Sequence, residues 1–545
     1  MAKVLITDKI NEAAVKIVEK AAAVDNLPTM EEDELCKIIG EYDALLVRSQ
    51  TKVTAKIIEA GKNLKIIGRA GVGVDNIDLD AATSHGIIVV NSPDGNTNAA
   101  AEHTVAMMLS MARNIPEAVK SVKEGKWERS KFTGVEVFGK TLGIIGLGKI
   151  GHHVAEVALA LGMKIIVFDP YTSREAVENM GAKYIEHLDD FWGECDFITV
   201  HTPKTKETTS LINKNTINRM KKGVRIVNCA RGGIIDEAAL KEALESGQVA
   251  SCALDVYEDE KNIQNNILLG FGKNVVLTPH LGASTDEAQV NVALDVARQV
   301  VSVLTGGDAT SAVNIPSLKP QKLEPVKDYM SISENIAQMA SQISKGNLKS
   351  IEIEVKGTLA DLDTSPLETA ILKGVLSSNL VGVNYVNAPL LAKKRGIEIS
   401  TKKSQQSTDY IGSISVTLNT DTGCTSVSGA LIAKHIKRIV KINDYNTSIK
   451  PEKHMLLVPH ENKPGMIASV ATVLGDDGVN ISRMQVAQKS YEKGQARCDE
   501  KSIMIINTDD TVEQNTLDKI AKINGIDEPL SLIHISEPTR LQLIS

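Results

Sequence analysis

Three glycines follow an apolar run near the middle of the chain, at a spacing that suits a dinucleotide. Residues 142–145 predict a strand, and Gly146, Gly148 and Gly151 then form the pattern G-x-G-x-x-G. Glycines allow the backbone to approach a pyrophosphate, which the N-terminus of the next helix stabilises. Asp169 lies 23 residues after Gly146, where a carboxylate accepts ribose hydrogen bonds and favours NAD over NADP. The plainer alternative is a tight strand–helix turn with a solvated aspartate.

A second set of residues could move a proton and hold a carboxylate. Histidine exchanges protons near neutral pH, so His280 could act on a hydroxyl while a hydride leaves the same carbon. A carboxylate such as Glu260 would fix the tautomer of the imidazole, and the guanidinium of Arg231 would clamp the substrate. The sequence alone does not show that these three residues lie close together in the fold. Taken singly, Glu260 resembles a solvated loop acid and His280 the end of a strand.

Polar or small residues also stand where predicted strands end, which is where ligands bind to open parallel sheets. With the glycine pattern, the candidate cofactor residues are Lys149, Ile150, Thr202, Pro203, Cys229 and Asp255. In the first part of the chain the residues at equivalent positions are Arg48, Ser49, Arg69 and Gly71. Two arginines at neighbouring strand ends suit a phosphate or carboxylate, although each alone is more often a surface residue.

These residues need parallel sheets to bring them together. Residues 1 to about 312 alternate short β-branched runs with helical stretches, which indicates α/β architecture with two Rossmann-like, doubly wound domains. The turn-rich segment NSPDGNTN leads out of the first domain, and a helix after His280 leads back. We therefore expect a discontinuous substrate-binding domain at 1–95 and 284–312 around an NAD-binding domain at 96–283.

Two smaller units follow a proline-containing linker at about 314–322. Residues 317–450 mix helical and strand patterns without a visible catalytic motif and predict an α+β intervening domain. Residues 452–529 predict a small domain of order βαββαβ, in which the turn HENKPG separates the first strand from the first helix.

Composition excludes several classes of protein. The 545 residues include 61 basic and 68 acidic side chains, a formal net charge of −7, and 3% aromatic residues. We find no basic block, signal-peptide core or long apolar span, so we expect no nucleic-acid or membrane partner. Six scattered cysteines without a CxxC pair argue against a disulfide framework or a structural zinc site. We therefore expect no metal and a reducing, cytoplasmic location.

The first 310 residues resemble the D-isomer-specific 2-hydroxyacid dehydrogenases. The segments that carry the resemblance include GRAGVGVDNID, SPDGNTNAAAEHTVAMML, LGIIGLGKIG, VNCARGGIIDE, ALDVYEDE and TPHLGASTDEAQ. The resemblance assigns the catalytic roles of the family to Arg231, Glu260 and His280. It places the cofactor residues of the family at Gly146, Gly148, Gly151, Asp169, Thr202, Cys229 and Asp255. It also implies that Arg48 and Arg69 meet the substrate, with Arg129 as a third arginine that a neighbouring subunit could supply.

Within this family the chain looks most like the branch that oxidises 3-phospho-D-glycerate with NAD to 3-phosphohydroxypyruvate, the first step of L-serine biosynthesis. One alternative is another D-2-hydroxyacid dehydrogenase, such as a glyoxylate or hydroxypyruvate reductase. A second is a non-catalytic NAD-sensing protein on the same fold. The apolar helix after NSPDGNTN and the GKWERSKF loop favour a homodimer, which the C-terminal domains could extend to a homotetramer.

The C-terminal units resemble the two extra domains of the long form of this enzyme. Residues 452–529 resemble an ACT domain, which implies L-serine as a feedback effector; the alternative is a turn without a ligand. The candidate effector residues are His460, Asn462, Gly465 and Asn480. In the intervening domain, Lys393, Lys394 and Arg395 could bind an anion but more often such a run is a solvated face.

The end of the chain departs from the ACT pattern. Residues 530–545 read LSLIHISEPTRLQLIS and resemble the translation of a sequencing adapter. We therefore expect this tail to be non-native and the last strand of the ACT-like domain to be missing. The alternative is a genuine amphipathic terminal segment that serves as the last strand.

Overall fold

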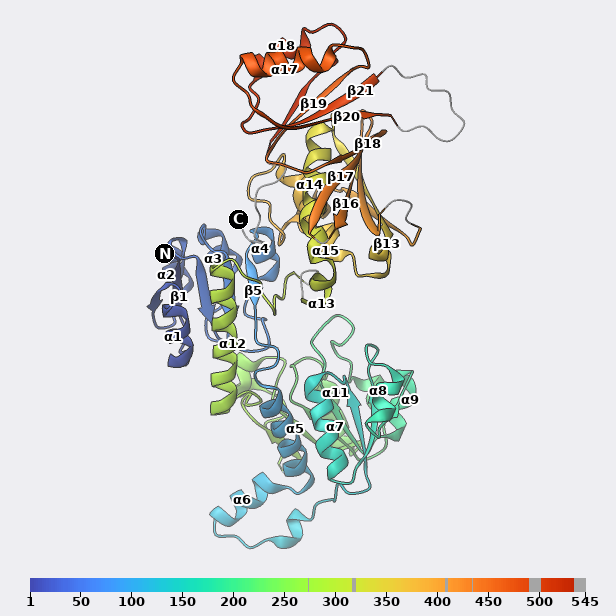
Figure 1. Ribbon diagram of the computed structural model, residues 1–545. Helices are drawn as coiled ribbons and strands as arrows, with labels where there is room; N and C mark the ends of the chain where they lie inside the picture. The colour runs from blue at the N-terminus through green and yellow to red at the C-terminus, as the bar shows by residue number, and fades with distance from the viewer. Residues whose placement is uncertain (273, 316–319, 407–409, 434, 490–500, 534–545) are drawn as a thin grey trace. The chain divides into compact units, whose positions relative to one another are not determined.

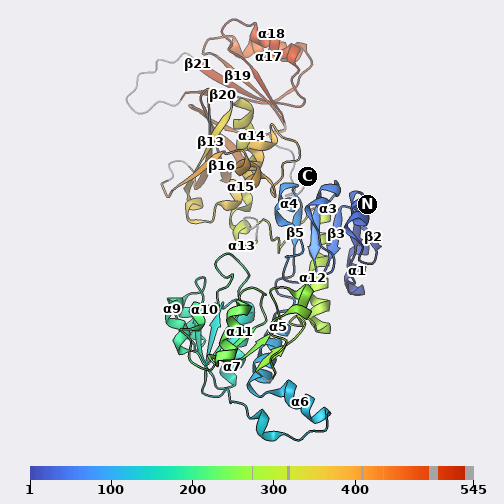
Figure 2. The ribbon, with the colours of Figure 1, turned by 180° about the vertical axis from the view of Figure 1, so that it is seen from behind.

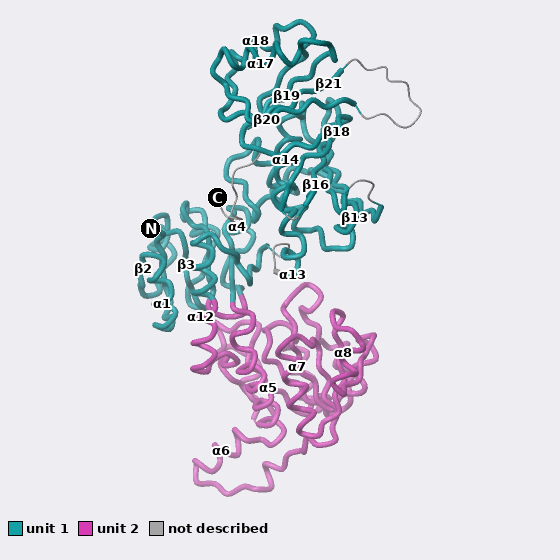
Figure 3. The backbone as a smooth tube through the Cα atoms, in the orientation of Figure 1, with its two compact units in different colours: residues 1–69, 74–91, 296–545 teal, residues 70–73, 92–295 magenta. Residues whose placement is uncertain are grey.

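The chain leaves its first sheet after residue 91 and returns to it at residue 296. The computed structural model describes residues 1–272, 274–315, 320–406, 410–433, 435–489 and 501–533. Unit 1 comprises residues 1–69, 74–91 and 296–545, and unit 2 comprises residues 70–73 and 92–295 (Figure 3). The helix α12 (Asp286–Leu304) contains the point at which the chain passes back into unit 1.

Unit 2 is built on a seven-stranded parallel sheet of order β12-β11-β10-β9-β6-β7-β8. The strands are β6 (Thr141–Ile145), β7 (Lys164–Phe168), β8 (Lys183–Tyr184), β9 (Phe197–Val200), β10 (Val224–Asn228), β11 (Val249–Leu254) and β12 (Val275–Leu277). The helices are α5 (Thr97–Ala112), α6 (Ile115–Lys123), α7 (Lys149–Ala160), α8 (Arg174–Asn179), α9 (Leu188–Phe191), α10 (Lys214–Ile217) and α11 (Glu237–Ser246). Because strand order reverses between β6 and β9, a ligand crevice is expected at their carboxyl ends.

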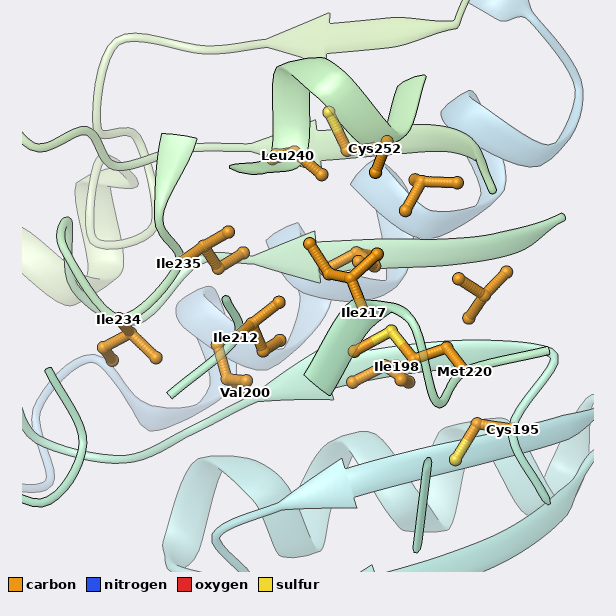
Figure 4. Packing of buried hydrophobic residues seen from close by; sticks show 14 of the residues in the cluster. Cys195, Ile198, Val200, Ile212, Ile217, Met220, Ile234, Ile235, Leu240 and Cys252 are labelled. Atoms are coloured by element: carbon orange, nitrogen blue, oxygen red, sulfur yellow. The ribbon is translucent and has the colours of Figure 1, made fainter. Parts of the chain in front are cut away.

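Apolar side chains cover both faces of this sheet, which explains the nearly continuous apolar strands of the sequence. One face packs against α10 and α11 through residues such as Ile198, Ile217 and Leu240 (Figure 4). The other face packs against α5 and α7 through residues such as Val105 and Val154 (Figures 1 and 2). The sheet is therefore a rigid layer whose strand ends can hold functional side chains in place.

Unit 1 begins with a five-stranded parallel sheet of order β2-β1-β3-β4-β5. Its elements are β1 (Lys3–Ile6), α1 (Glu12–Glu19), β2 (Ala23–Asn26), α2 (Glu32–Ile38), β3 (Ala44–Val47), α3 (Ala55–Ala60), β4 (Ile66–Arg69), α4 (Leu79–Ser84) and β5 (Ile88–Val90). The end of α12 packs on this sheet at Gly68, where a Cβ would lie 2.6 Å from the Val296 side chain and 3.0 Å from that of Val300. The first 91 residues thus need a helix from much later in the chain. Two parallel sheets confirm the predicted Rossmann-like α/β fold.

A six-stranded mixed sheet of order β14-β13-β15-β16-β17-β18 forms the next part of unit 1. Its strands are β13 (Leu348–Gly357), β14 (Glu398–Ser404), β15 (Gly412–Thr420), β16 (Cys424–Ala433), β17 (Ile436–Ile442) and β18 (Tyr445–Ile449). Its main helices are α14 (Lys327–Ile343), α15 (Ser365–Ser377) and α16 (Ala388–Lys394). Arg395 directly follows α16 and lines a pocket of about 490 Å³ with residues of α14 and α15.

The last sheet has the order β20-β21-β19-β22, and α17 and α18 pack together on one of its faces (Figure 1). Its elements are β19 (His454–Glu461), α17 (Met466–Asp476), β20 (Ile481–Gln488), β21 (Lys501–Thr508), α18 (Gln514–Ala521) and β22 (Leu530–Ile533). The expectation of a missing last strand differs from the structure, because Leu457 pairs with Leu530 and His454 with Ile533. Residues 534–545 lie outside the described part, and the adapter origin of the tail stays a prediction.

Candidate active site

The structure brings two of the predicted catalytic residues into contact. Nδ1 of His280 lies 3.0 Å from Oε2 of Glu260, and both side chains are about half exposed. When Nδ1 carries the proton and donates to the carboxylate, Nε2 is left to accept a proton from a substrate. Burial alone would raise the pKa of Glu260, but the hydrogen bond and charge of His280, with the charge of Arg231, lower it below its usual value. Glu260 is therefore an ionised partner near neutral pH.

Arg231 lies on a turn that is organised by Asn228, the last residue of β10. Asn228 is almost fully buried; its Nδ2 donates to the Arg231 carbonyl at 2.9 Å, and its Oδ1 accepts from the Ala230 amide at 2.9 Å. The next residue, Gly232, passes so close to Tyr257 that a Cβ would lie 1.7 Å from the Tyr257 carbonyl oxygen. The turn with Arg231 and the segment that leads to Glu260 are thus in direct backbone contact.

The segment before Glu260 is attached to the first turn of α11 by two glutamates. The Glu258 amide donates to Oε1 of Glu237 at 2.8 Å, and the Glu237 amide donates to Oε1 of Glu258 at 3.2 Å. Asn266 donates to the other oxygen of Glu237 at 2.7 Å. Burial is the main reason that the pKa of Glu237 is raised. These contacts hold both ends of the 3-10 turn Glu260–Asn265.

The glycine pattern forms the turn between β6 and α7. Gly146 has a φ of 92°, and a Cβ on Gly151 would lie 2.2 Å from the Gly146 carbonyl oxygen, so both positions require glycine. A Cβ on Gly148, the N-cap of α7, would meet no atom within 4 Å. This exposed helix N-terminus fits a pyrophosphate. The methyl group of Thr202 lies beside Gly146, and its hydroxyl is buried without a hydrogen-bond partner among the described residues, which also fits a bound dinucleotide.

Asp169 is more enclosed than the sequence suggested. Its side chain is nearly buried; Oδ2 accepts from the Leu147 amide at 2.6 Å and Oδ1 from the Tyr171 amide at 2.7 Å. The carboxylate therefore supports the glycine turn directly, and each oxygen retains a lone pair for a ribose hydroxyl. Lys149 forms an ion pair with Asp94.

The remaining predicted cofactor residues occupy the strand ends of unit 2. Pro203 follows β9 and accepts from Thr208 through its carbonyl at 2.6 Å. Cys229 follows β10, and burial raises the pKa of its thiol to about 12, so it is a neutral thiol. Asp255 follows β11 and is fully buried. Ile150 packs from α7 against the core.

The predicted anion-binding residues lie in two places. Arg48 follows β3 and Arg69 ends β4; these strands are parallel neighbours, with Val47 paired to Arg69, so both arginines belong to one edge of the sheet. Arg48 donates to the Lys9 carbonyl at 3.1 Å, and Ser49 is the next residue. In unit 2, the Gly71 carbonyl accepts from Ser92 at 2.9 Å. Arg129 begins an exposed 3-10 turn of the same unit.

The predicted effector residues are only partly together. Asn462 and Gly465 lie on the exposed turn between β19 and α17. His460 is 2% exposed, and its Nδ1 is 3.1 Å from the Val458 carbonyl oxygen. Asn480 donates to Asp509 at 2.7 Å. The turn that carries Asn462 and Gly465 is therefore exposed to solvent, whereas the side chain of His460 is buried in the domain.

Relatives that match nearly the whole chain decide the family. A D-3-phosphoglycerate dehydrogenase from Synechocystis sp. is 47% identical over 528 residues, covering 96% of this chain and 94% of that protein. D-3-phosphoglycerate dehydrogenases from Methanocaldococcus jannaschii and Bacillus subtilis are each 43% identical, over 96% of this chain and 98% of the relative. The chain belongs to the D-3-phosphoglycerate dehydrogenase family.

The domain signatures of the D-3-phosphoglycerate dehydrogenase family follow one another along the chain. Residues 105–282 match the NAD binding domain of D-isomer specific 2-hydroxyacid dehydrogenases, residues 325–443 the D-3-phosphoglycerate dehydrogenase intervening domain, and residues 454–525 the ACT domain. A glyoxylate reductase from Paecilomyes thermophila is structurally similar, with a TM-score of 0.54 and 32% identity, covering 58% of this chain and 99% of that chain. A D-lactate dehydrogenase from Aquifex aeolicus, solved with NAD and lactic acid, gives a TM-score of 0.50 at 32% identity, over 56% of this chain and 96% of that chain.

The family, the α/β fold and the NAD cofactor predicted from sequence are confirmed. Among the described helices, none has the length and apolar character needed to cross a bilayer. The roles of individual site residues and the domain boundaries stay predictions. Sequence reasoning missed the supporting residues Asn228, Glu237 and Thr278, because nothing in their local sequence separates them from ordinary strand-end or helix-start residues.

Proposed function

We propose that this protein oxidises 3-phospho-D-glycerate at C2 to 3-phosphohydroxypyruvate, with NAD as the hydride acceptor, as the first step of L-serine biosynthesis. The observation that carries the proposal is the 3.0 Å contact between His280 and Glu260, at the strand ends of a domain whose family binds NAD. The names of the relatives supply the substrate.

The chemistry follows from the site. Nε2 of His280 takes the proton of the C2 hydroxyl, while the hydrogen on C2 leaves as a hydride and the C–O bond becomes a carbonyl. The carboxylate of Glu260 stabilises the imidazolium that forms. Arg231 holds the substrate carboxylate beside the reacting carbon. Bound NAD supplies the electrophilic ring that accepts the hydride.

The phosphate end of the substrate belongs to the sheet of unit 1. We assign it to Arg48 and Arg69, whose strands are parallel neighbours. Two guanidinium groups at one sheet edge offer several donors to a dianion. We accordingly propose residues 1–95 and 284–312 as the substrate-binding domain and 96–283 as the NAD-binding domain.

Initial rates test the assignment. NADH production from 3-phosphoglycerate should far exceed production from glycerate or lactate, and His280→Gln should lower kcat by about 10²-fold or more. The matched control is His85→Gln, because His85 is an exposed histidine whose Nδ1 lies 2.9 Å from the Ala81 carbonyl oxygen in the helix that precedes it. Faster turnover of a substrate without phosphate would indicate another D-2-hydroxyacid dehydrogenase. A lack of turnover with 3-phosphoglycerate, glycerate and lactate would indicate a non-catalytic NAD-sensing protein.

We further propose L-serine as the ligand of the ACT domain, at the turn between β19 and α17. The accessible amide of Asn462 and the left-handed Gly465 (φ 92°) give this turn open backbone groups for a carboxylate and an ammonium. L-serine should lower the initial rate of the intact chain, and Asn462→Ala should weaken that inhibition. Serine-independent rates in the wild-type chain would refute the effector.

We also propose that a second copy of the chain covers the exposed apolar side chains around α6, so that the enzyme is at least a homodimer. Ile115, Val119, Val122 and Trp127 are 45%, 46%, 60% and 81% exposed. Arg129 is two residues beyond Trp127, so such an interface would present it to the neighbouring copy. Val122→Glu should lower the mass measured by light scattering; an unchanged mass would refute this interface. We also propose a cytoplasmic location, which the six scattered cysteines favour.

A further inference from the structure

The turn that carries His280 is held by a buried carboxylate. His280 has a φ of 56°, in the left-handed region that residues other than glycine rarely adopt. The next two amides both donate to Asp255: Leu281 to Oδ1 at 2.8 Å and Gly282 to Oδ2 at 2.9 Å. A fully buried side chain therefore fixes the backbone immediately after the proposed base.

Two side chains complete the set of donors to this carboxylate. Oγ1 of Thr278, which precedes the turn, donates to Oδ1 of Asp255 at 2.5 Å. Nε2 of His103 lies 3.2 Å from the same oxygen and 3.3 Å from Oγ1 of Thr278. Burial would raise the pKa of Asp255, but the hydrogen bonds from His103, Thr278 and the two amides lower it, so the group is an anion.

His103 differs from the other donors in its origin. Thr278, Leu281 and Gly282 belong to the segment that carries His280 and would move with it. His103 lies on α5, which packs against the sheet through Val105 and other core residues. Among the described donors, it is therefore the one that connects the carboxylate directly to α5; Thr278 also reaches this helix, through a longer contact of 3.6 Å with Sδ of Met107.

We propose that His103 is a positioning residue for the reaction: through Asp255 it fixes the turn of His280 relative to the helix α5, and so keeps the imidazole against Glu260. The hydrogen bonds found for His103 in the described part of the chain go to Asp255 and Thr278, and that of the His280 ring goes to Glu260, so the proposed action of His103 is indirect. The proposal rests on the proposed function, because it assumes that His280 is the base.

The test compares two substitutions in the full chain. Gln can place an amide N–H near the position of Nε2, whereas Leu keeps apolar volume and removes the donor. We expect His103→Leu to lower kcat with 3-phosphoglycerate by about tenfold, since small displacements of catalytic groups have effects of this order. The KM values for both substrates should change little, and His103→Gln should recover most of the rate.

A double substitution distinguishes a positioning role of His103 from a general loss of structure in the His103 variant. In a Glu260→Gln background the contact that His103 protects is already altered, so adding His103→Leu should lower kcat by much less than tenfold. Additive losses would overturn the proposal, as would equal losses in the Leu and Gln variants, a wild-type rate in His103→Leu, or a loss confined to KM for NAD. A wild-type chain without activity on 3-phosphoglycerate would instead refute the proposed function, whatever the variants do.

Discussion

Replacing Gly232 by alanine tests whether the turn with Arg231 must touch the segment that leads to Glu260. The added Cβ would lie 1.7 Å from the carbonyl oxygen of Tyr257 and 3.0 Å from its amide nitrogen. Both are backbone atoms, so no side-chain rotation relieves the overlap. Gly232 is not among the glycines with positive φ, so the effect of the methyl group is steric and not conformational.

The expected loss follows from the displacement that the methyl group requires. An ordinary contact begins near 3.4 Å, so the two segments must separate by about 1.7 Å at this point. A displacement of about 1 Å in a catalytic group lowers rates by about 10²-fold. We therefore expect kcat/KM for 3-phosphoglycerate to fall by at least about 10²-fold, which corresponds to about 2.7 kcal/mol of transition-state stabilisation.

Steady-state rates, measured by NADH absorbance, test the expected loss of kcat/KM when they are combined with two controls. Gly270→Ala adds the same methyl group in the same unit, where no atom lies within 4 Å, and should leave kcat/KM unchanged. Binding of NAD to Gly232→Ala should persist, because the glycine turn at 146–151 is not involved. A folded Gly232→Ala protein with kcat/KM within threefold of wild type would refute the inferred coupling of the two segments.

Three further predictions concern the nucleotide-binding domain. Gly151→Ala should abolish measurable NAD binding in titrations, because its Cβ would lie 2.2 Å from the Gly146 carbonyl oxygen; normal affinity would show that the turn can open. Asp169→Ala should raise KM for NAD with little effect on kcat, because the Leu147 amide loses its acceptor; an unchanged KM would contradict this. Burial lowers the pKa of His201 to about 4 from 6.5, so the unfolded chain takes up a proton first as pH falls. Stability should therefore decline from about pH 6.5 towards pH 4, by about 2 kcal/mol between pH 7 and pH 5, and urea titrations of His201→Asn should lack this decline.

The sequence was most informative where function depends on one residue type at a strand end. Apolar β-branched runs located the strands of both parallel sheets except β2 and β8, and parallel strands place their ends at one edge. This is why Arg231 and His280 could be predicted as candidates from type and position, while their catalytic roles came from the family resemblance. The strand β2 has the sequence AVDN and no fully buried residue, so it left no such signal. It is recognised only through its pairing with β1.

The residues that support the candidate active site could not be predicted from the sequence, and the reason differs from that for β2. His103 and Thr278 are 175 residues apart, and their 3.3 Å contact depends on how α5 packs on the sheet. A pattern that is read locally contains no information on such a pair. The end of the chain shows the opposite case: the sequence at 530–533 looked foreign to the domain, yet its apolar alternation suffices to pair with β19.

The insertion of residues 92–295 between two parts of unit 1 has a consequence for synthesis on the ribosome. The first 91 residues emerge with the face of β4 at Gly68 uncovered, since Val296 and Val300 are translated about 200 residues later. At roughly 5–20 residues per second this interval lasts about 10–40 s, which is long enough for the nucleotide-binding unit to fold first. The N-terminal sheet must remain soluble during that time without its covering helix. We therefore expect nascent chains to depend most on chaperones before residue 296 has been translated.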